Sequence, residues 1–129
     1  MILGIGTDIV EIKHFKSSWK KAPALLKRVF TKNELKKADA LSPQKRLSFY
    51  AKRFAGKEAV TKACGTGIGK DISWQDVEIL NDTQGAPVVK LSLKAQKFLQ
   101  KKFKVKKVET RISLSDEKKY VVAFALLQK

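Results

Sequence analysis

Two short segments contain the residues that could do chemistry. The first, residues 4–12, places Asp8 in an otherwise apolar, β-branched run. Burying a carboxylate there is costly unless a cation or hydrogen bonds satisfy it. The second, residues 53–67, carries Glu58 and Lys62 and ends in glycines. Together, the two carboxylates and the nearby cations could hold a hard metal ion against a phosphate-bearing ligand.

Glu58 and Lys62 also have a simpler interpretation, because residues four apart on a helix share one face. Glu before Lys at this spacing is a common surface ion pair that contributes only about 0.2–0.5 kcal/mol. Asp8 favours the functional interpretation, since Mg²⁺ is typically held by one or two carboxylates while phosphates and water complete its octahedron. Asp8 and Glu58 would suffice for such a site.

The glycines do not form either of the familiar phosphate loops. A dinucleotide fingerprint starting at Gly4 needs glycine where Ile9 stands, and a P-loop ending at Lys70 needs Ser or Thr where Asp71 stands. The run 65–69 could still bring backbone N–H groups close to a phosphate, but a helix stop followed by a turn explains it nearly as well.

The elements that position these residues follow from hydrophobic spacing and capping signals. Residues 2–12 predict a strand buried on most of its surface. Thr31 and Glu34 form a capping-box pattern that starts a short helix through about Leu41. Ser42-Pro43 starts the longest helix, which Gly65 ends. The remaining prediction is a helix carrying Phe15 and Trp19, a helical stretch after Pro23, a hairpin of 74–80 and 87–91, a helix over 93–103, and paired strands at 106–114 and 120–127.

This pattern predicts one α+β domain spanning residues 1–129. The formal charge of +16 favours an anionic partner, but the motifs of nucleic-acid-binding proteins are missing. The lone Cys64 excludes an internal disulfide, and the single histidine, His14, lies among lysines, as is typical of a solvated basic face. No secretory signal or membrane span is readable, which predicts a soluble cytoplasmic protein.

The chain resembles the holo-acyl-carrier-protein synthase family of 4′-phosphopantetheinyl transferases. The resemblance rests on motifs in that family's order and spacing over nearly the whole chain: residues 4–12, 30–34, 53–67 and 74–79, then Gly85-x-Pro87, 112–115 and 124–125. It implies a single domain with an antiparallel sheet packed on a long central helix. It also implies transfer of 4′-phosphopantetheine from coenzyme A to a serine of apo acyl carrier protein, in support of fatty acid and lipid biosynthesis, leaving adenosine 3′,5′-bisphosphate.

The resemblance also assigns roles to residues. Asp8 and Glu58 would hold Mg²⁺ against the pyrophosphate, and Lys62 would neutralise a phosphate oxygen. Either water on the metal or Glu58 itself would take the serine proton. The nucleotide-binding residues implied are Arg53, Lys62, Gly65, Thr66 and Gly67.

The resemblance further implies a homotrimer with the nucleotide site between subunits, and an acidic carrier protein docked on the basic helix after the first strand. The residues implied for docking are Lys13, His14, Lys16, Lys20 and Lys21. Gly56 stands in place of a small alanine, at a cost of about 1 kcal/mol if it is exposed. A larger departure is Asp116, an anion where the family usually has histidine, so Lys118, Lys119 or Arg46 would have to contact the 3′-phosphate. A member that keeps the fold without activity is the alternative.

Overall fold

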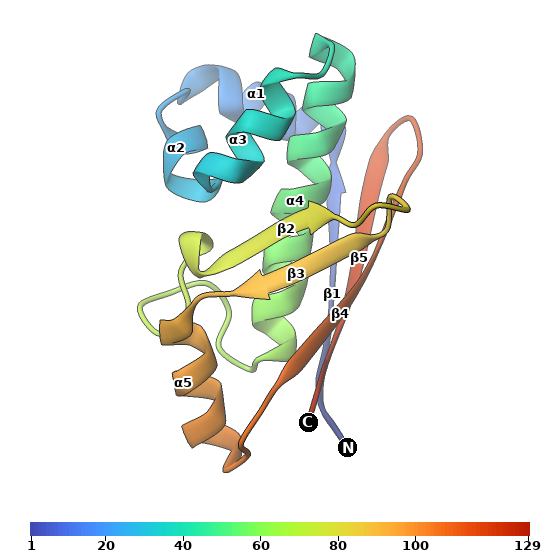
Figure 1. Ribbon diagram of the computed structural model, residues 1–129. Coiled ribbons are helices and arrows are strands. Elements are labelled where there is room, and N and C mark those ends of the chain that lie inside the picture. Colours follow the sequence, from blue (N-terminus) through green and yellow to red (C-terminus); the bar gives the residue numbers. More distant parts are fainter.

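A computed structural model describes residues 1–129, with a long central helix packed against an antiparallel sheet (Figure 1). The helix is α4 (Pro43–Ala63), and the sheet has the strand order β1-β5-β4. This confirms the predicted α+β class and layering. The other elements are β1 (Ile2–Glu11), α1 (Ile12–Lys21), α2 (Leu25–Val29), α3 (Lys32–Asp39), the 3-10 turn η1 (Trp74–Asp76), β2 (Val77–Asn81), β3 (Pro87–Leu91), α5 (Leu93–Phe103), β4 (Glu109–Asp116) and β5 (Tyr120–Gln128).

The sheet presents one face to α4 and leaves the other open. Side chains alternate between the two faces of a strand, so from Gly4 onward the even positions of β1, Asp8 included, point toward α4. The odd positions point outward, where Ile5 and Ile9 are both 63% exposed. The prediction that this first strand is buried on most of its surface is therefore wrong for a single chain. No other layer of the same chain covers the outer face.

Two glycines let β1 lie close against α4. A Cβ atom at Gly4 would collide with the carbonyl oxygen of Ala63, and one at Gly6 would collide with that of Ala59. The small side chains on the helix complete this close approach of strand and helix backbones. Asp8 follows directly on this face and is thereby brought beside α4.

The starts of α3 and α4 follow the predicted signals. Thr31 and Glu34 form both hydrogen bonds of a capping box at α3. Ser42 caps α4 by accepting a hydrogen bond from the N–H of Lys45, with Pro43 in the first turn. Past the end of α4, Gly65 takes a positive φ of 77°, which suits a helix stop. Gly56 is buried rather than exposed, because the side chain of Ile79 packs against it.

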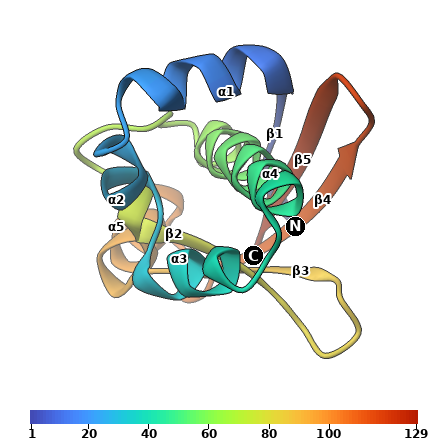
Figure 2. The ribbon, with the colours of Figure 1, turned by 90° about the horizontal axis from the view of Figure 1, so that it is seen from above.

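A second layer lies across α4 from the first sheet. β2 and β3 form an antiparallel hairpin, and α1, α2 and α3 surround the first half of α4 (Figure 2). The predicted strand over 74–80 begins only at Val77, because Asp76 accepts hydrogen bonds from Ser73 and forms the short turn η1. None of the helices is long and apolar enough to cross a membrane.

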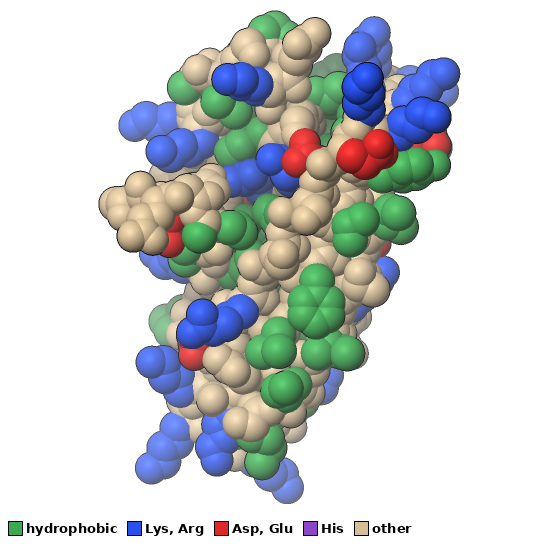
Figure 3. Space-filling model, turned by 90° about the vertical axis from the view of Figure 1, so that its right-hand side faces the viewer, with side chains coloured by type: hydrophobic (Ala, Val, Ile, Leu, Met, Phe, Trp, Pro, Cys, Tyr) green, Lys and Arg blue, Asp and Glu red, His purple; other side chains and the backbone are tan.

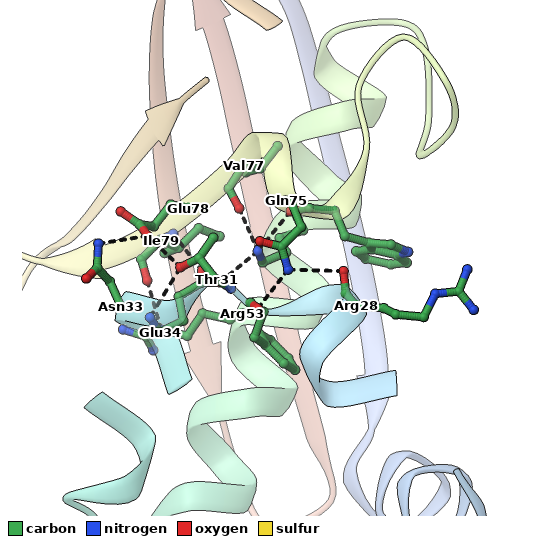
Figure 4. Close-up of polar contacts among 12 residues, drawn as sticks. Arg28, Thr31, Asn33, Glu34, Arg53, Gln75, Val77, Glu78 and Ile79 are labelled. Atoms are coloured by element: carbon green, nitrogen blue, oxygen red, sulfur yellow. Dashed lines mark hydrogen bonds and ion pairs between the residues drawn. The ribbon is translucent and has the colours of Figure 1, made fainter. Parts of the chain in front are cut away.

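A buried ion pair joins α4 to α3, at the network of polar contacts around Glu34 (Figure 4). The Nζ of Lys57 lies 2.8 Å from a carboxylate oxygen of Glu34, and both side chains are 0% exposed. Lys57 also donates to the carbonyl oxygens of Trp74 and Val77, while Glu34 accepts the backbone N–H groups of Thr31 and Ile79. The pair thus fixes the orientation of α4 at the residue immediately before Glu58.

Candidate active site

Asp8 and Glu58 line the same pocket, of about 520 Å³, between β1, α1 and α4. Asp8 comes from the inner face of β1, and Glu58 comes from the middle of α4. Much of the remaining wall is aromatic and includes Phe15, Trp19 and Phe54. Two carboxylates therefore lie in one partly apolar pocket, where charges interact more strongly than in bulk water.

Lys62 is bound to Asp8 rather than to Glu58. Its Nζ donates to Oδ1 of Asp8 at 3.2 Å and to the carbonyl oxygen of Thr7 at 3.0 Å. The surface ion pair between Glu58 and Lys62, the simpler interpretation of their spacing, is not formed. The Lys62 side chain is half exposed, so its ammonium remains open to a second anion.

Glu58 is the carboxylate that burial and its neighbour perturb. Burial raises its pKa above the usual range, the charge of Asp8 raises it further, and Lys62 opposes the rise. The Glu58 carboxylate accepts no hydrogen bond within the chain, since only its backbone oxygen is bonded, to Thr61. A carboxylate with a raised pKa and free oxygens is suited to bind a cation or to accept a proton.

The donor set fits a magnesium ion. Asp8 and Glu58 both offer carboxylates in one pocket, and their mutual repulsion is the interaction that a divalent cation would remove. No third acid, histidine or cysteine lies close enough to form a three-residue metal cluster with them. Mg²⁺ does not need one, because it commonly keeps water and phosphate oxygens in its remaining positions.

The glycine turn at the end of α4 has little unused hydrogen-bonding capacity. The N–H groups of Thr66 and Gly67 both bond to the carbonyl oxygen of Thr61, and that of Gly65 bonds to Lys62. Lys102 closes the helix end from α5 by donating to the carbonyl oxygen of Cys64. A ligand at this turn would therefore meet side chains and an open surface rather than free N–H groups.

Cys64 itself is buried. Burial raises the pKa of its thiol to about 11, although Lys102 opposes the rise. The thiol therefore stays protonated at neutral pH, where it is a weak nucleophile.

Arg53 lies on another side of α4 and is not brought together with Asp8, Glu58 and Lys62. Its Nε donates to the carbonyl oxygen of Ile79, and its Nη2 donates to Oδ1 of Asn81. The guanidinium carbon lies 3.8 Å from the centre of the Phe49 ring. Burial lowers its pKa to about 10, although Glu34 opposes the shift, so the group remains charged at neutral pH. A single chain therefore separates the predicted residues into two groups.

A second, basic pocket of about 270 Å³ surrounds Arg53. Lys45 and Lys52 also line it, and sequence reasoning missed both. Their spacing of seven, with Arg53 next to Lys52, puts all three cations on neighbouring faces of one helix and could have revealed them. Asp116 lies at this pocket's rim, where it accepts a hydrogen bond from Ser48 and lies 3.7 Å from Lys52.

Arg46, one of the cations considered for the 3′-phosphate, is already engaged. It donates to the backbone oxygens of Ala38, Asp39 and Leu41 at the end of α3. The five basic residues implied for carrier docking are all exposed on α1: Lys13, His14, Lys16, Lys20 and Lys21. His14 also lines the pocket of Asp8 and Glu58, which joins this helix surface to the carboxylates.

Residues 4–125 match the model of the 4′-phosphopantetheinyl transferase superfamily. The chain is 43% identical over 128 residues to the holo-[acyl-carrier-protein] synthase of Pelagibacter ubique, covering 99% of this chain and 98% of that protein. It is also 43% identical over 127 residues to the holo-[acyl-carrier-protein] synthase of Shewanella amazonensis, covering 98% of each chain.

Solved structures show the same fold. The holo-[acyl-carrier-protein] synthase of Neisseria meningitidis superposes with a TM-score of 0.87 at 35% identity, covering 100% of both chains. A holo-(acyl-carrier-protein) synthase of Bacillus anthracis, solved in complex with CoA (3′,5′-ADP), gives a TM-score of 0.82 at 35% identity, covering 98% of this chain and 96% of that one.

Proposed function

The chain belongs to the 4′-phosphopantetheinyl transferase superfamily, and on this premise we propose that it transfers 4′-phosphopantetheine from coenzyme A to a serine of an apo acyl carrier protein. The products are holo acyl carrier protein and adenosine 3′,5′-bisphosphate. The observation that carries the proposal is that Asp8 and Glu58 line one pocket, with Lys62 bound to Asp8. Phosphoryl-type transfer asks mainly for such positioning and charge neutralisation.

Asp8 and Glu58 are the residues that would hold Mg²⁺, which would supply neutralisation of the negative charge that develops on the leaving phosphate. Lys62 adds a cation to the same rim. Its ammonium is held by Asp8 and by the carbonyl oxygen of Thr7, and the half-exposed side chain leaves it able to bind a phosphate oxygen.

Glu58 is also the chain's own candidate for the proton of the carrier's serine. Its carboxylate has a raised pKa and accepts no hydrogen bond within the chain. A group whose pKa is shifted toward neutral accepts a proton without holding it too weakly or too tightly.

The separation of Arg53 from Asp8 supports the further proposal of a homotrimer. If the nucleotide lies between subunits, the basic pocket around Arg53 on one chain would face Asp8 and Glu58 on the next. Such a head-to-tail contact closes into a ring when its rotation allows. The outer face of the sheet offers apolar surface for it: Ile5, Ile9, Val122 and Phe124 are exposed, and Figure 3 shows hydrophobic side chains gathered on this side of the molecule.

The basic face of α1 supports docking of an acidic carrier protein beside the pocket of Asp8 and Glu58. Lys16, Lys20 and Lys21 are exposed there, and none of them forms an ion pair within the chain. Opposite charges on such surfaces accelerate encounter and orient the partners. A place in fatty acid and lipid biosynthesis in the cytoplasm is part of this proposal.

The first test is the intact mass of an apo acyl carrier protein incubated with this protein, coenzyme A and Mg²⁺, with and without chelator. We expect a gain of one phosphopantetheine group that chelator abolishes. Asp8→Ala and Glu58→Ala should each lower the transfer rate at least about 10²-fold, as the loss of a group that stabilises transition-state charge does. No transfer by a folded protein would contradict the function, and full transfer by both variants would contradict the metal site.

A further inference from the structure

A second basic groove, of about 640 Å³, lies on the far side of α1 from the pocket of Asp8 and Glu58. It is lined by Lys13 and Lys16 from α1 and by Lys118 and Lys119 from the turn between β4 and β5. Glu11 is the one carboxylate among its lining residues. Four ammonium groups against one carboxylate make this groove a surface for an anion.

The groove is built by contacts between segments far apart in the sequence. The backbone N–H of Ile12, at the start of α1, donates to the carbonyl oxygen of Lys119 at 2.8 Å. The turn of Lys119 is itself held by Glu117, whose side chain accepts the N–H groups of Lys119 and Tyr120. Figure 2 shows this turn beside the first turn of α1. The four lysines are therefore held on one rigid edge rather than on a loose loop.

The charges of this groove are left uncompensated by the chain. None of Lys13, Lys16, Lys118 and Lys119 takes part in an ion pair, whereas the carboxylate of Asp116 at the end of β4 is turned toward Ser48 and Lys52 on α4. Figure 3 shows Lys and Arg side chains gathered at this end of the molecule, above the apolar patch of the sheet. The lysines are thus free to meet charges on a partner.

The groove adjoins the carrier-docking surface proposed for α1, because Lys13 and Lys16 belong to both. In the sheet Asp8 pairs with Ala123 and Glu11 pairs with Tyr120. Three residues of strand, at about 3.3 Å each, separate the two pairs by about 10 Å. A helix of about seven residues covers that distance at about 1.5 Å per residue. A carrier protein that presents its serine to the pocket of Asp8 is therefore large enough to present acidic side chains to the groove on the other side of α1 as well.

We propose that Lys118 and Lys119 extend the carrier-docking surface of α1 onto the β4–β5 turn, so that an acidic carrier protein is gripped by two elements rather than one; this rests on the proposed function. A protein surface fits better than a nucleotide, because the lysines are spread along an open groove and only one aromatic side chain, Tyr120, is present for a base to stack on.

The test is the double variant Lys118→Glu/Lys119→Glu, with Lys106→Glu/Lys107→Glu as its matched control. Lys106 and Lys107 are also adjacent, exposed lysines and lie before the opposite end of β4, so the change in net charge is the same. Initial rates are measured against carrier protein and, separately, against coenzyme A. Exposed ion pairs are individually weak, and reversing two charges should raise the KM for carrier protein about tenfold. The KM for coenzyme A and kcat should stay within about twofold, as should all constants of the control.

Two results would overturn the inference. One is an unchanged KM for carrier protein in the test variant. The other is a raised KM for coenzyme A, which would assign the groove to the nucleotide instead. Binding of apo carrier protein, followed by calorimetry without coenzyme A, separates this inference from the proposed function. Weaker binding by the test variant than by the control supports the docking surface even if wild type transfers nothing, whereas equal binding by all three proteins contradicts it.

Discussion

Lys57 shows how much one side chain can contribute to the site without touching a substrate. It is fully buried, and its ammonium is bonded to Glu34 and to two backbone oxygens. Burial lowers its pKa, although Glu34 opposes the shift. Because Glu58 is the next residue on α4, the ion pair that fixes Lys57 also limits the rotation of Glu58 about the helix axis.

We expect Lys57→Met to lower the free energy of unfolding by about 3–5 kcal/mol, because it leaves the Glu34 carboxylate buried without its cation. Urea denaturation followed by circular dichroism measures this. Lys45→Met, at an exposed lysine of the same helix, should change stability by no more than about 0.5 kcal/mol. Adding Glu34→Gln to Lys57→Met should recover part of the loss, since the two residues interact directly. Equal effects of Lys57→Met and Lys45→Met would contradict this account.

At the scale of single residues, the candidate site residues were easier to predict than the hydrogen bonds between them. That Asp8 and Glu58 are candidate site residues was predictable, because a carboxylate in an apolar strand and a second one on a helix near phosphate-compatible cations are unusual residue choices. The structure places both in one pocket, and their role stays a prediction. The hydrogen bond from Lys62 to Asp8 was not predictable, because this contact depends on how closely β1 approaches α4. The separation of Arg53 from Glu58 was predictable, because five residues along one helix place two side chains about 140° apart.

Individual elements were predictable where their signals are local. The caps at Thr31 and Ser42 involve residues only three positions apart, and both form as expected. Trp74 was assigned to a strand wrongly, because the turn that removes it depends on Asp76, which also accepts a hydrogen bond from the distant Ser92. The prediction that β1 is buried on most of its surface was wrong for a similar reason. Its outward apolar side chains indicate burial by another layer, and the single chain does not supply that layer.

The contact of β1 with α4 gives a prediction at this scale. Gly6→Ala would force the strand away from the carbonyl oxygen of Ala59 and move Asp8 relative to Glu58. We expect stability to fall by about 1–3 kcal/mol and transfer to fall more than stability explains. Gly69→Ala is the control, because a Cβ there meets nothing within 4 Å. Thermal melts and transfer rates measured side by side would refute the idea if Gly6→Ala kept wild-type activity.

Asp76 ties η1 to the start of α5 and predicts a pH dependence. Burial alone would raise its pKa, but hydrogen bonds from Ser73, Ser92 and Lys94 outweigh burial and hold the pKa below the usual 3.8. A lowered folded-state pKa means that its stabilisation is present above about pH 4 and is lost as the pH falls through the folded value.

Asp76→Asn should therefore reduce the free energy of unfolding by about 1–3 kcal/mol at pH 7, with a smaller difference from wild type at pH 3. Urea denaturation at several pH values measures both. Asp71→Asn, an exposed aspartate whose carboxylate accepts no hydrogen bond, should differ little from wild type throughout. A difference for Asp76→Asn that stays constant down to pH 3 would show that the charge of Asp76 is not what stabilises this junction.

At the scale of the whole molecule, the uncovered face of the sheet and the division of the site both favour the proposed trimer. Phe124 is 44% exposed at the middle of β5, on the face that carries Ile5 and Ile9. Phe124→Lys should dissociate the proposed trimer and abolish transfer, while the monomer stays folded because Phe124 does not point into the core. Light scattering after gel filtration gives the mass. Val88→Lys, at an exposed apolar residue of β3, should leave both mass and transfer unchanged.

The division of the site between two sides of α4 has a genetic consequence. Suppose that Asp8 of one chain works with the basic pocket of the next. Asp8→Ala and Lys45→Glu/Lys52→Glu should then each inactivate the enzyme, but each variant alters a different half of the shared site. Mixed rings refolded from equal amounts would contain about one intact site in four, because each site draws its halves independently. Two dead alleles would then rescue one another, which no enzyme with its site inside a single chain allows.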